Sequence, residues 1–139
     1  MTPMSLILQE CIMRGLFLIG VGGFLGAVMR YSLSGAVQWF TQSFRFPFGT
    51  LAVNVLGSFL LVFLASMADS LGVFGPTIRS FVFIGFLGAF TTFSTFSYES
   101  TLLMLDGEGI LTAINIIANV GLCLAAAWCG RAAVYWIWG

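Results

Sequence analysis

The sequence predicts an all-α membrane protein with about four transmembrane helices. Of its 139 residues, 60% are apolar and only 7% are charged, whereas soluble domains carry roughly 25% charged residues. The chain therefore lacks the polar residues that a water-soluble surface needs. Three stretches hold no charged residue, namely 46–68, 80–98 and 109–130, and each is long enough to cross a bilayer as a helix.

The first helix is expected at about 13–37. The uncharged stretch between Arg14 and Arg30 is short, but arginine side chains at its ends can reach the headgroups. The apolar pattern also resumes beyond Arg30. A cleaved signal peptide is the alternative interpretation, and the absence of an Ala-x-Ala-like site after the apolar stretch argues against it.

The three remaining helices are expected at about 48–68, 77–104 and 110–136, which makes residues 1–139 a single integral membrane domain. Pro47 and Pro76 suit the first turns of the second and third helices. A short acidic turn at 106–109 precedes the fourth helix, whose aromatic end at 135–138 is typical of a membrane-interface anchor.

The charged residues exclude several classes of function. The five basic and five acidic residues give a net charge of zero, so nothing favours nucleic acid as a partner. The chain has no His, which removes the commonest acid–base group and metal ligand. No nucleophile–base pair is visible, so an enzyme is not expected. Three cysteines without a CxxC spacing argue against a disulfide framework or a zinc site.

The arginines show only a weak bias between the two sides of the membrane. Arg14, Arg79 and Arg131 fall on one side, Arg45 falls on the other, and Arg30 is ambiguous. Orientation follows such a bias, so insertion in both orientations is compatible with the sequence, as is a single orientation set by another factor. A protomer this small is expected to need a partner to line a pore.

The third helix carries the most unusual segment, 91–97, in which five of seven residues have hydroxyl groups. Each hydroxyl could bond the carbonyl of residue i−4. Their density beside Gly85 and Gly88 instead favours an interruption of the helix, which membrane proteins tolerate when it is buried or faces a cavity. The freed carbonyls would suit a hard monovalent cation. Phe93 and Phe96 lie among these hydroxyls, so their positive ring edges could line an anion path, with lipid contact or core packing as the alternative.

Polar residues also mark the second and fourth helices. Asn54 lies on one face with Thr50 and Ser58, and its amide could hold an anion or bond a neighbouring helix. Asn115, Asn119 and Cys123 form a stripe on the fourth helix, which indicates either a hydrated track or helix packing. A second group stands near helix ends: Glu99 could face water, and Arg30 could be structural or concentrate anions at a vestibule.

Three segments together resemble the CrcB/Fluc family of fluoride channels. They are 22–31 (GGFLGAVMRY), 48–58 (FGTLAVNVLGS) and 85–99 (GFLGAFTTFSTFSYE). The match covers the first three helices with specific motifs, and the fourth helix matches more loosely.

The resemblance implies a fluoride-selective channel that exports fluoride passively across the bacterial cytoplasmic membrane. It implies an antiparallel, dual-topology homodimer in the lipid bilayer, with the third helix broken near its middle. It implies a structural Na⁺ held by the main chain of Gly88 and Thr91. The fluoride pore would comprise Asn54, Phe93, Ser94, Thr95, Phe96, Asn115 and Asn119. At residues 115 and 123 the sequence departs from the aromatic and serine residues expected of the family.

Two other classes of protein stay open at this point. A small four-helix exporter of drugs or cations would need a carboxylate embedded in the first helix, and Glu10 precedes that helix. An accessory membrane subunit would not need polar residues placed on three helices.

Overall fold

The computed structural model describes residues 3–43 and 45–138, and every regular element in that part of the chain is helical. The elements are α1 (Pro3–Thr41), α2 (Phe48–Leu71), α3 (Pro76–Arg79), the π-helical segment η1 (Ser80–Leu87), α4 (Gly88–Phe90), α5 (Phe93–Leu105) and α6 (Gly109–Trp138). The stretches long and apolar enough to cross a membrane are Ile12–Thr41, Phe48–Leu71, Pro76–Leu105 and Gly109–Trp138. The expected all-α, multi-pass membrane protein is thus confirmed.

Glycine and proline mark the end of α2 and the start of α3. After α2, Gly72 adopts a left-handed conformation with φ of 62°, and its N–H donates to the Ala68 carbonyl at 3.0 Å. Pro76 then begins α3. All four spans run beyond the ranges expected from the sequence, most clearly α1, which begins at Pro3, and α2, which continues to Leu71. The added turn of α2 carries Asp69, which forms an ion pair with Arg79.

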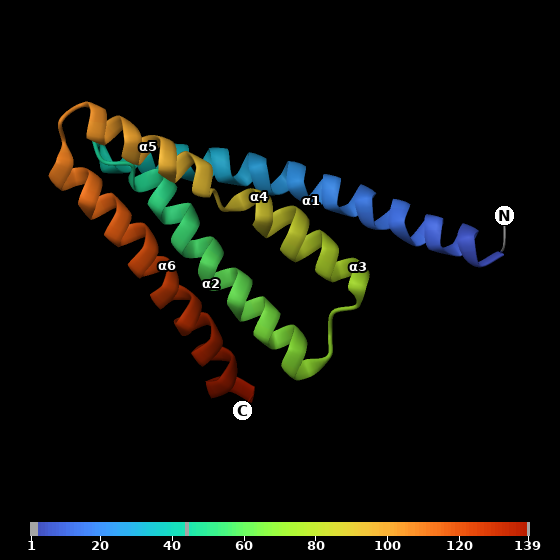
Figure 1. Ribbon diagram of the computed structural model, residues 1–139. Helices are drawn as coiled ribbons and strands as arrows, with labels where there is room; N and C mark the ends of the chain where they lie inside the picture. The colour runs from blue at the N-terminus through green and yellow to red at the C-terminus, as the bar shows by residue number, and fades with distance from the viewer. Residues whose placement is uncertain (1–2, 44, 139) are drawn as a thin grey trace.

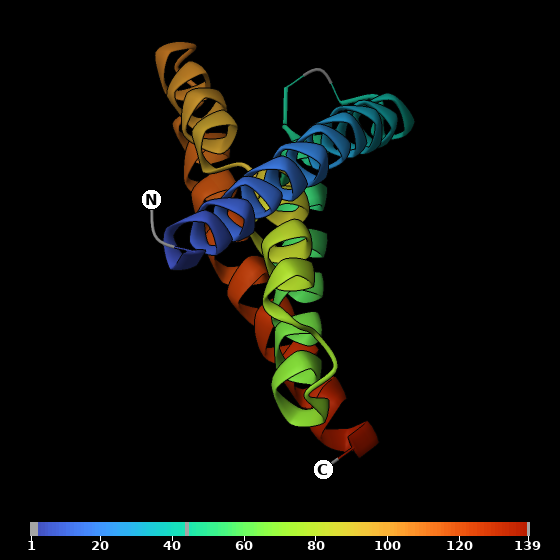
Figure 2. The ribbon, with the colours of Figure 1, turned by 90° about the vertical axis from the view of Figure 1, so that its right-hand side faces the viewer.

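Two helix pairs organise the molecule. Figure 1 shows α2 and α6 running side by side, and these two helices contact each other along their length. Helix α1 packs mainly on η1, and it also contacts α2 and α4. Figure 2 shows that α1 crosses these segments obliquely instead of running parallel to them. The third span therefore lies between α1 on one side and α2 on the other.

Glycines allow α1 to approach η1 at main-chain distance. A Cβ atom at Gly26 would lie 2.1 Å from the Phe86 carbonyl oxygen, and one at Gly22 would lie 2.6 Å from the Phe81 carbonyl oxygen. Such contacts are sterically impossible, so only glycine fits at these two positions. Small residues at helix interfaces are the usual means of close packing in membranes.

The interior of the bundle is partly polar. Buried apolar residues include Val53 and Leu87, but three asparagines are also buried: Asn54, Asn115 and Asn119. Large apolar side chains cover much of the outside, as expected of a surface that faces lipid. Because uncompensated polar groups are costly in hydrocarbon, the buried asparagines mark the place to look for a functional site.

Candidate functional site

The third span bends at two residues with extended backbone. Thr91 has φ, ψ of −86°, 157° and Thr92 has −150°, 111°, and they separate α4 from α5. Thr92 is the N-cap of α5, because its Oγ1 accepts from the Thr95 main-chain N–H at 3.2 Å. The bend lies at the start of the hydroxyl-rich segment 91–97.

Asn54 on α2 holds the main chain of the bend. Its Oδ1 accepts the Thr92 N–H at 2.8 Å, and its Nδ2 donates to the Thr92 carbonyl at 3.1 Å. One carboxamide thus satisfies both main-chain groups of a residue that lies outside a helix. At 9% exposed, this side chain provides the partners that a buried backbone requires.

The bend changes which groups bind the carbonyls of α4. In a continuous helix the Thr92 N–H would bond the Gly88 carbonyl, but it donates to Asn54. Likewise the Thr95 N–H would bond the Thr91 carbonyl, but it donates to Thr92 Oγ1. Among the described residues no other hydrogen bond to these two carbonyls is found. The Ala89 carbonyl, by contrast, accepts from Arg30 Nε at 3.1 Å.

Polar side chains on α6 continue from Asn54 into the bundle. Asn54 Nδ2 donates to Asn119 Oδ1 at 3.1 Å, and Asn119 Nδ2 donates to Asn115 Oδ1 at 2.9 Å. Asn115 Nδ2 then donates to Ser100 Oγ at 3.0 Å, and Ser100 Oγ donates to the Phe96 carbonyl at 2.8 Å. These bonds join α2, α6 and α5 through buried side chains.

An open cavity of about 430 Å³, which we call the bend cavity, lies next to these asparagines. Asn54, Asn119 and Cys123 line it together with both phenylalanines. The Phe93 and Phe96 rings meet edge to face, with centroids 5.3 Å apart. Phe96 is 7% exposed whereas Phe93 is 77% exposed, so Phe93 lies at the open side of the cavity.

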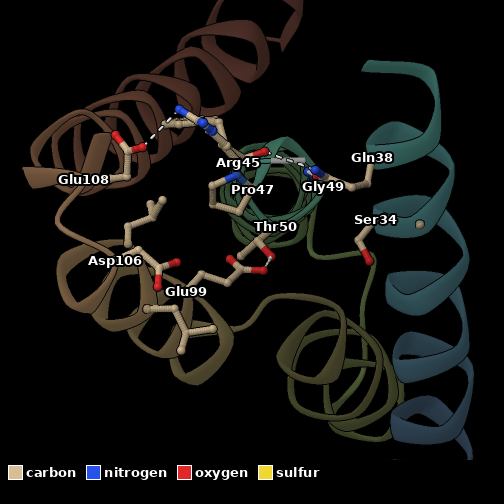
Figure 3. Close-up of a pocket in the computed structure, with 13 residues that line it drawn as sticks. Ser34, Gln38, Arg45, Pro47, Gly49, Thr50, Glu99, Asp106 and Glu108 are labelled. Carbon is tan, nitrogen blue, oxygen red and sulfur yellow. Dashed lines mark hydrogen bonds and ion pairs between the residues drawn. The ribbon is translucent and has the colours of Figure 1, made fainter. Parts of the chain in front are cut away.

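A second cavity of about 660 Å³, the end cavity, lies between α1, α2 and α5 and the loops that precede α2 and α6 (Figure 3). Its wall is rich in charged and polar side chains. Thr50 Oγ1 donates to Glu99 Oε1 at 2.7 Å, and Arg45 pairs with Glu108 at 3.1 Å. Glu99 Oε2 is buried and has no hydrogen-bond partner among the described residues.

Gln38 fixes the loop that rims the end cavity. Its Oε1 accepts the Gly49 N–H at 3.1 Å, and its Nε2 donates to the Phe46 carbonyl, also at 3.1 Å. Figure 3 shows Gln38 reaching from α1 toward the start of α2. The sequence reasoning missed this residue, because a lone Gln near the end of an apolar helix gives no signal.

The structure brings some of the expected site residues together and separates others. Asn54, Phe93, Phe96 and Asn119 surround the bend cavity, whereas Glu99 lines the end cavity. The remaining residues have other places: Ser94 and Thr95 contact Thr92 Oγ1, Arg30 contacts Ala89, and Asn115 is fully buried behind Asn119. Ser100 was not anticipated, although its position four residues after Phe96 places it on the same helix face.

The helices and these cavities define a multi-pass membrane protein whose polar side chains gather inside a short helix bundle. Residues 17–131 match the family model described as CrcB-like protein, Camphor Resistance (CrcB). The chain belongs to this CrcB-like family.

Curated relatives cover most of the chain. A protein named fluoride-specific ion channel FluC from Campylobacter jejuni (strain 81-176) is 50% identical over 115 residues, which are 83% of this chain and 93% of the relative. A protein of the same name from Elusimicrobium minutum is 45% identical, over 86% of this chain and 92% of the relative. A protein named fluoride-specific ion channel FluC 1 from Methanosarcina acetivorans is 46% identical, over 86% of this chain and 89% of the relative.

Proposed function

We propose that this chain is a fluoride-specific ion channel that lets fluoride leave the cytoplasm passively through the bacterial cytoplasmic membrane. The observation that carries the proposal is the 50% identity, over 83% of the chain, to a relative that bears this name. A channel for fluoride lowers cytoplasmic fluoride without any catalytic step, so no enzyme chemistry is invoked.

The two cavities supply the ends of a route for the ion. Thr50 and Asn54 are one turn apart on α2, with Thr50 in the end cavity and Asn54 in the bend cavity. On α5, Phe96 lines the bend cavity and Glu99 lines the end cavity. The ion would therefore cross the short wall between them, where hydrogen-bond donors replace its water.

The phenylalanines contribute at the open side of the bend cavity. Ring edges carry partial positive charge, and because Phe93 and Phe96 both line the cavity, their edges would offer an anion this charge without a full cation. An anion can interact with such edges and still leave, which conduction requires. Ser94 and Thr95 support this region through their contacts with the Thr92 hydroxyl.

The charged residues near the route have separate roles in this proposal. Arg30 neutralises the carbonyl end of α4 through Ala89, since cations stabilise helix C-termini. Glu99 is held by Thr50 at the wall of the end cavity.

The bend acts as the break in the third helix, and its carbonyls would hold Na⁺. Gly88 and Thr91 fit this role because both carbonyls have lost their helical donors, and carbonyl oxygen is the ligand that hard monovalent cations take. Bound Na⁺ supplies a fixed positive charge that neutralises the carbonyl dipoles at the bend.

The functional unit is an antiparallel, dual-topology homodimer. Support comes from the weak arginine bias and from Phe93, whose exposed ring leaves the bend cavity open on one side. A second copy would close that side. Accessibility of a C-terminal tag from both faces of the membrane tests the topology, and labelling from one face alone would contradict it.

Fluoride efflux from liposomes tests the proposed function. Purified protein in fluoride-loaded vesicles is expected to release fluoride rapidly without ATP or a proton gradient, as measured with a fluoride electrode. Phe93→Leu removes the ring edges and Asn54→Leu removes the amide, so each should slow efflux by about tenfold or more. Phe40→Leu is the matched control, because Phe40 is also 77% exposed but lies outside both cavities.

Two outcomes would overturn the proposal. The first is proton-driven efflux of toxic cations without any fluoride leak, which would indicate an exporter. The second is absence of transport by folded protein, which would favour an accessory subunit.

A further inference from the structure

The buried hydrogen bonds around the bend form one chain with a single direction. The Thr92 N–H donates to Asn54, whose Nδ2 donates to Asn119. Asn119 donates to Asn115, which donates to Ser100, and Ser100 donates to the Phe96 carbonyl. The chain starts at Thr92, the N-cap of α5, passes through α2 and α6, and ends on the first turn of α5.

The two ends of this chain determine the orientation of every amide between them. A main-chain N–H can only donate and a carbonyl can only accept. With Thr92 donating at one end, the Asn54 amide must turn its NH₂ group toward Asn119. Turning Asn119 over would place its NH₂ against that of Asn54, and its oxygen against the two Asn115 oxygens that now accept from it at 2.9 and 3.2 Å.

This arrangement leaves Asn54 without a free donor. One of its N–H groups is held by the Thr92 carbonyl and the other by Asn119 Oδ1, each at 3.1 Å. The first bond belongs to a paired contact with the main chain, so it is the harder one to break. An anion in the bend cavity, which both Asn54 and Asn119 line, must therefore exchange with the Asn119 oxygen.

We propose that fluoride and the Asn119 oxygen compete for this N–H of Asn54, and that Asn115 acts as a positioning residue by fixing the Asn119 amide. The inference rests on the proposed fluoride channel, and it assigns the selectivity for fluoride over larger halides to this competition. Fluoride is a small ion, and Coulomb energy rises as the distance to the donor shortens. Fluoride therefore displaces the amide oxygen, whereas a larger halide held at a longer distance does not.

Asn115 differs from Asn119 in exposure, which supports separate roles. Asn115 has 0% of its surface exposed and lies outside the bend cavity lining, whereas Asn119 is part of that lining. Asn115 accepts both N–H groups of Asn119, one through its side chain and one through its main chain. It thus controls the amide without touching the cavity.

The test measures fluoride and chloride efflux from the same vesicles. Asn119→Leu removes the competing oxygen, so chloride efflux should rise and the fluoride-to-chloride ratio should fall by about tenfold or more. Asn115→Leu should lower the ratio by less, because the main-chain carbonyl still accepts one N–H. Asn115→Thr keeps an uncharged oxygen acceptor, so it should preserve more of the ratio than Asn115→Leu. Thr112→Val, one turn away and bonded only to Glu108, is the control and should preserve the ratio.

The outcomes separate this inference from the proposed function. If the wild-type protein carries no fluoride, the proposed function fails. If it carries fluoride but Asn119→Leu slows fluoride without admitting chloride, Asn119 is a direct fluoride ligand and the competition is wrong. If a leucine variant does not fold, nuclear magnetic resonance of the wild-type side-chain amides decides: the Asn54 and Asn119 signals should shift with NaF and not with NaCl. Equal shifts with both salts would overturn the inference.

Discussion

At the scale of single residues, Thr92 links the bend to the helix that follows it. Its Oγ1 accepts the Thr95 N–H and donates to Thr95 Oγ1 at 2.9 Å, while its main chain is held by Asn54. A hydroxyl at this position therefore satisfies an N–H group at a helix terminus that has no helical partner.

Thr92→Val should destabilise the protein by about 1 kcal/mol, which is typical for the loss of an N-cap. The two side chains have almost the same shape, so the change isolates the hydroxyl. The free energy of unfolding in detergent measures the effect. Thr101→Val on the same helix is the matched control, because its hydroxyl bonds only the exposed Ser97 carbonyl. Equal stability of the two variants would show that the cap contributes nothing.

The residues of the α6 stripe show where sequence reasoning stops. Asn115 and Asn119 are four apart, and the periodicity correctly places them on one face. It cannot show that α5 covers Asn115 while Asn119 stays at a cavity. That difference depends on Ser100 of α5, a contact between segments whose packing angle no local pattern encodes.

At the scale of elements, the contact between α1 and η1 depends on glycine. Gly26→Ala would bring a methyl group to 2.1 Å from the Phe86 carbonyl, which belongs to a rigid main chain. The helices must separate, so we expect a loss of stability of about 2 kcal/mol or more. Thermal unfolding in detergent measures it. Gly20→Ala on the same helix meets nothing within 4 Å and should be neutral or slightly stabilising. Similar effects of both substitutions would contradict this packing.

The ends of several elements follow from local chemistry, and the irregular middle of the third span does not. Proline and glycine mark the start of α3 and the end of α2, as their backbone preferences require. The π-helical geometry of η1 has no such signal. Gly85 of η1 packs against the main chain of α1. A Cβ atom at Gly85 would lie 2.7 Å from the Ile19 carbonyl oxygen. Long-range packing of this kind is present only once the helices have come together.

At the scale of the whole molecule, the proposed function makes the bend a link between stability and ion binding. Asn54 takes the Thr92 N–H and thereby leaves the Gly88 carbonyl without its helical donor. The same side chain therefore supports the cavity wall and leaves a carbonyl oxygen that is a ligand of the proposed Na⁺. Removing Asn54 should let the Thr92 N–H return toward Gly88, which links the fluoride route to the proposed Na⁺ site.

Because of this link, we expect Asn54→Leu to reduce the dependence of protein stability on Na⁺. A ligand that binds only the folded state stabilises it in proportion to RT ln(1 + [L]/Kd). The wild-type unfolding midpoint should therefore rise with NaCl more than with KCl at equal ionic strength, and the proposed dimer, measured by light scattering, should persist longest in Na⁺. In Asn54→Leu the difference between the two salts should shrink, whereas in Thr112→Val it should match the wild type, because Thr112 lies away from the bend. Identical midpoints in Na⁺ and K⁺ for the wild-type protein would mean that the carbonyls of Gly88 and Thr91 hold no Na⁺.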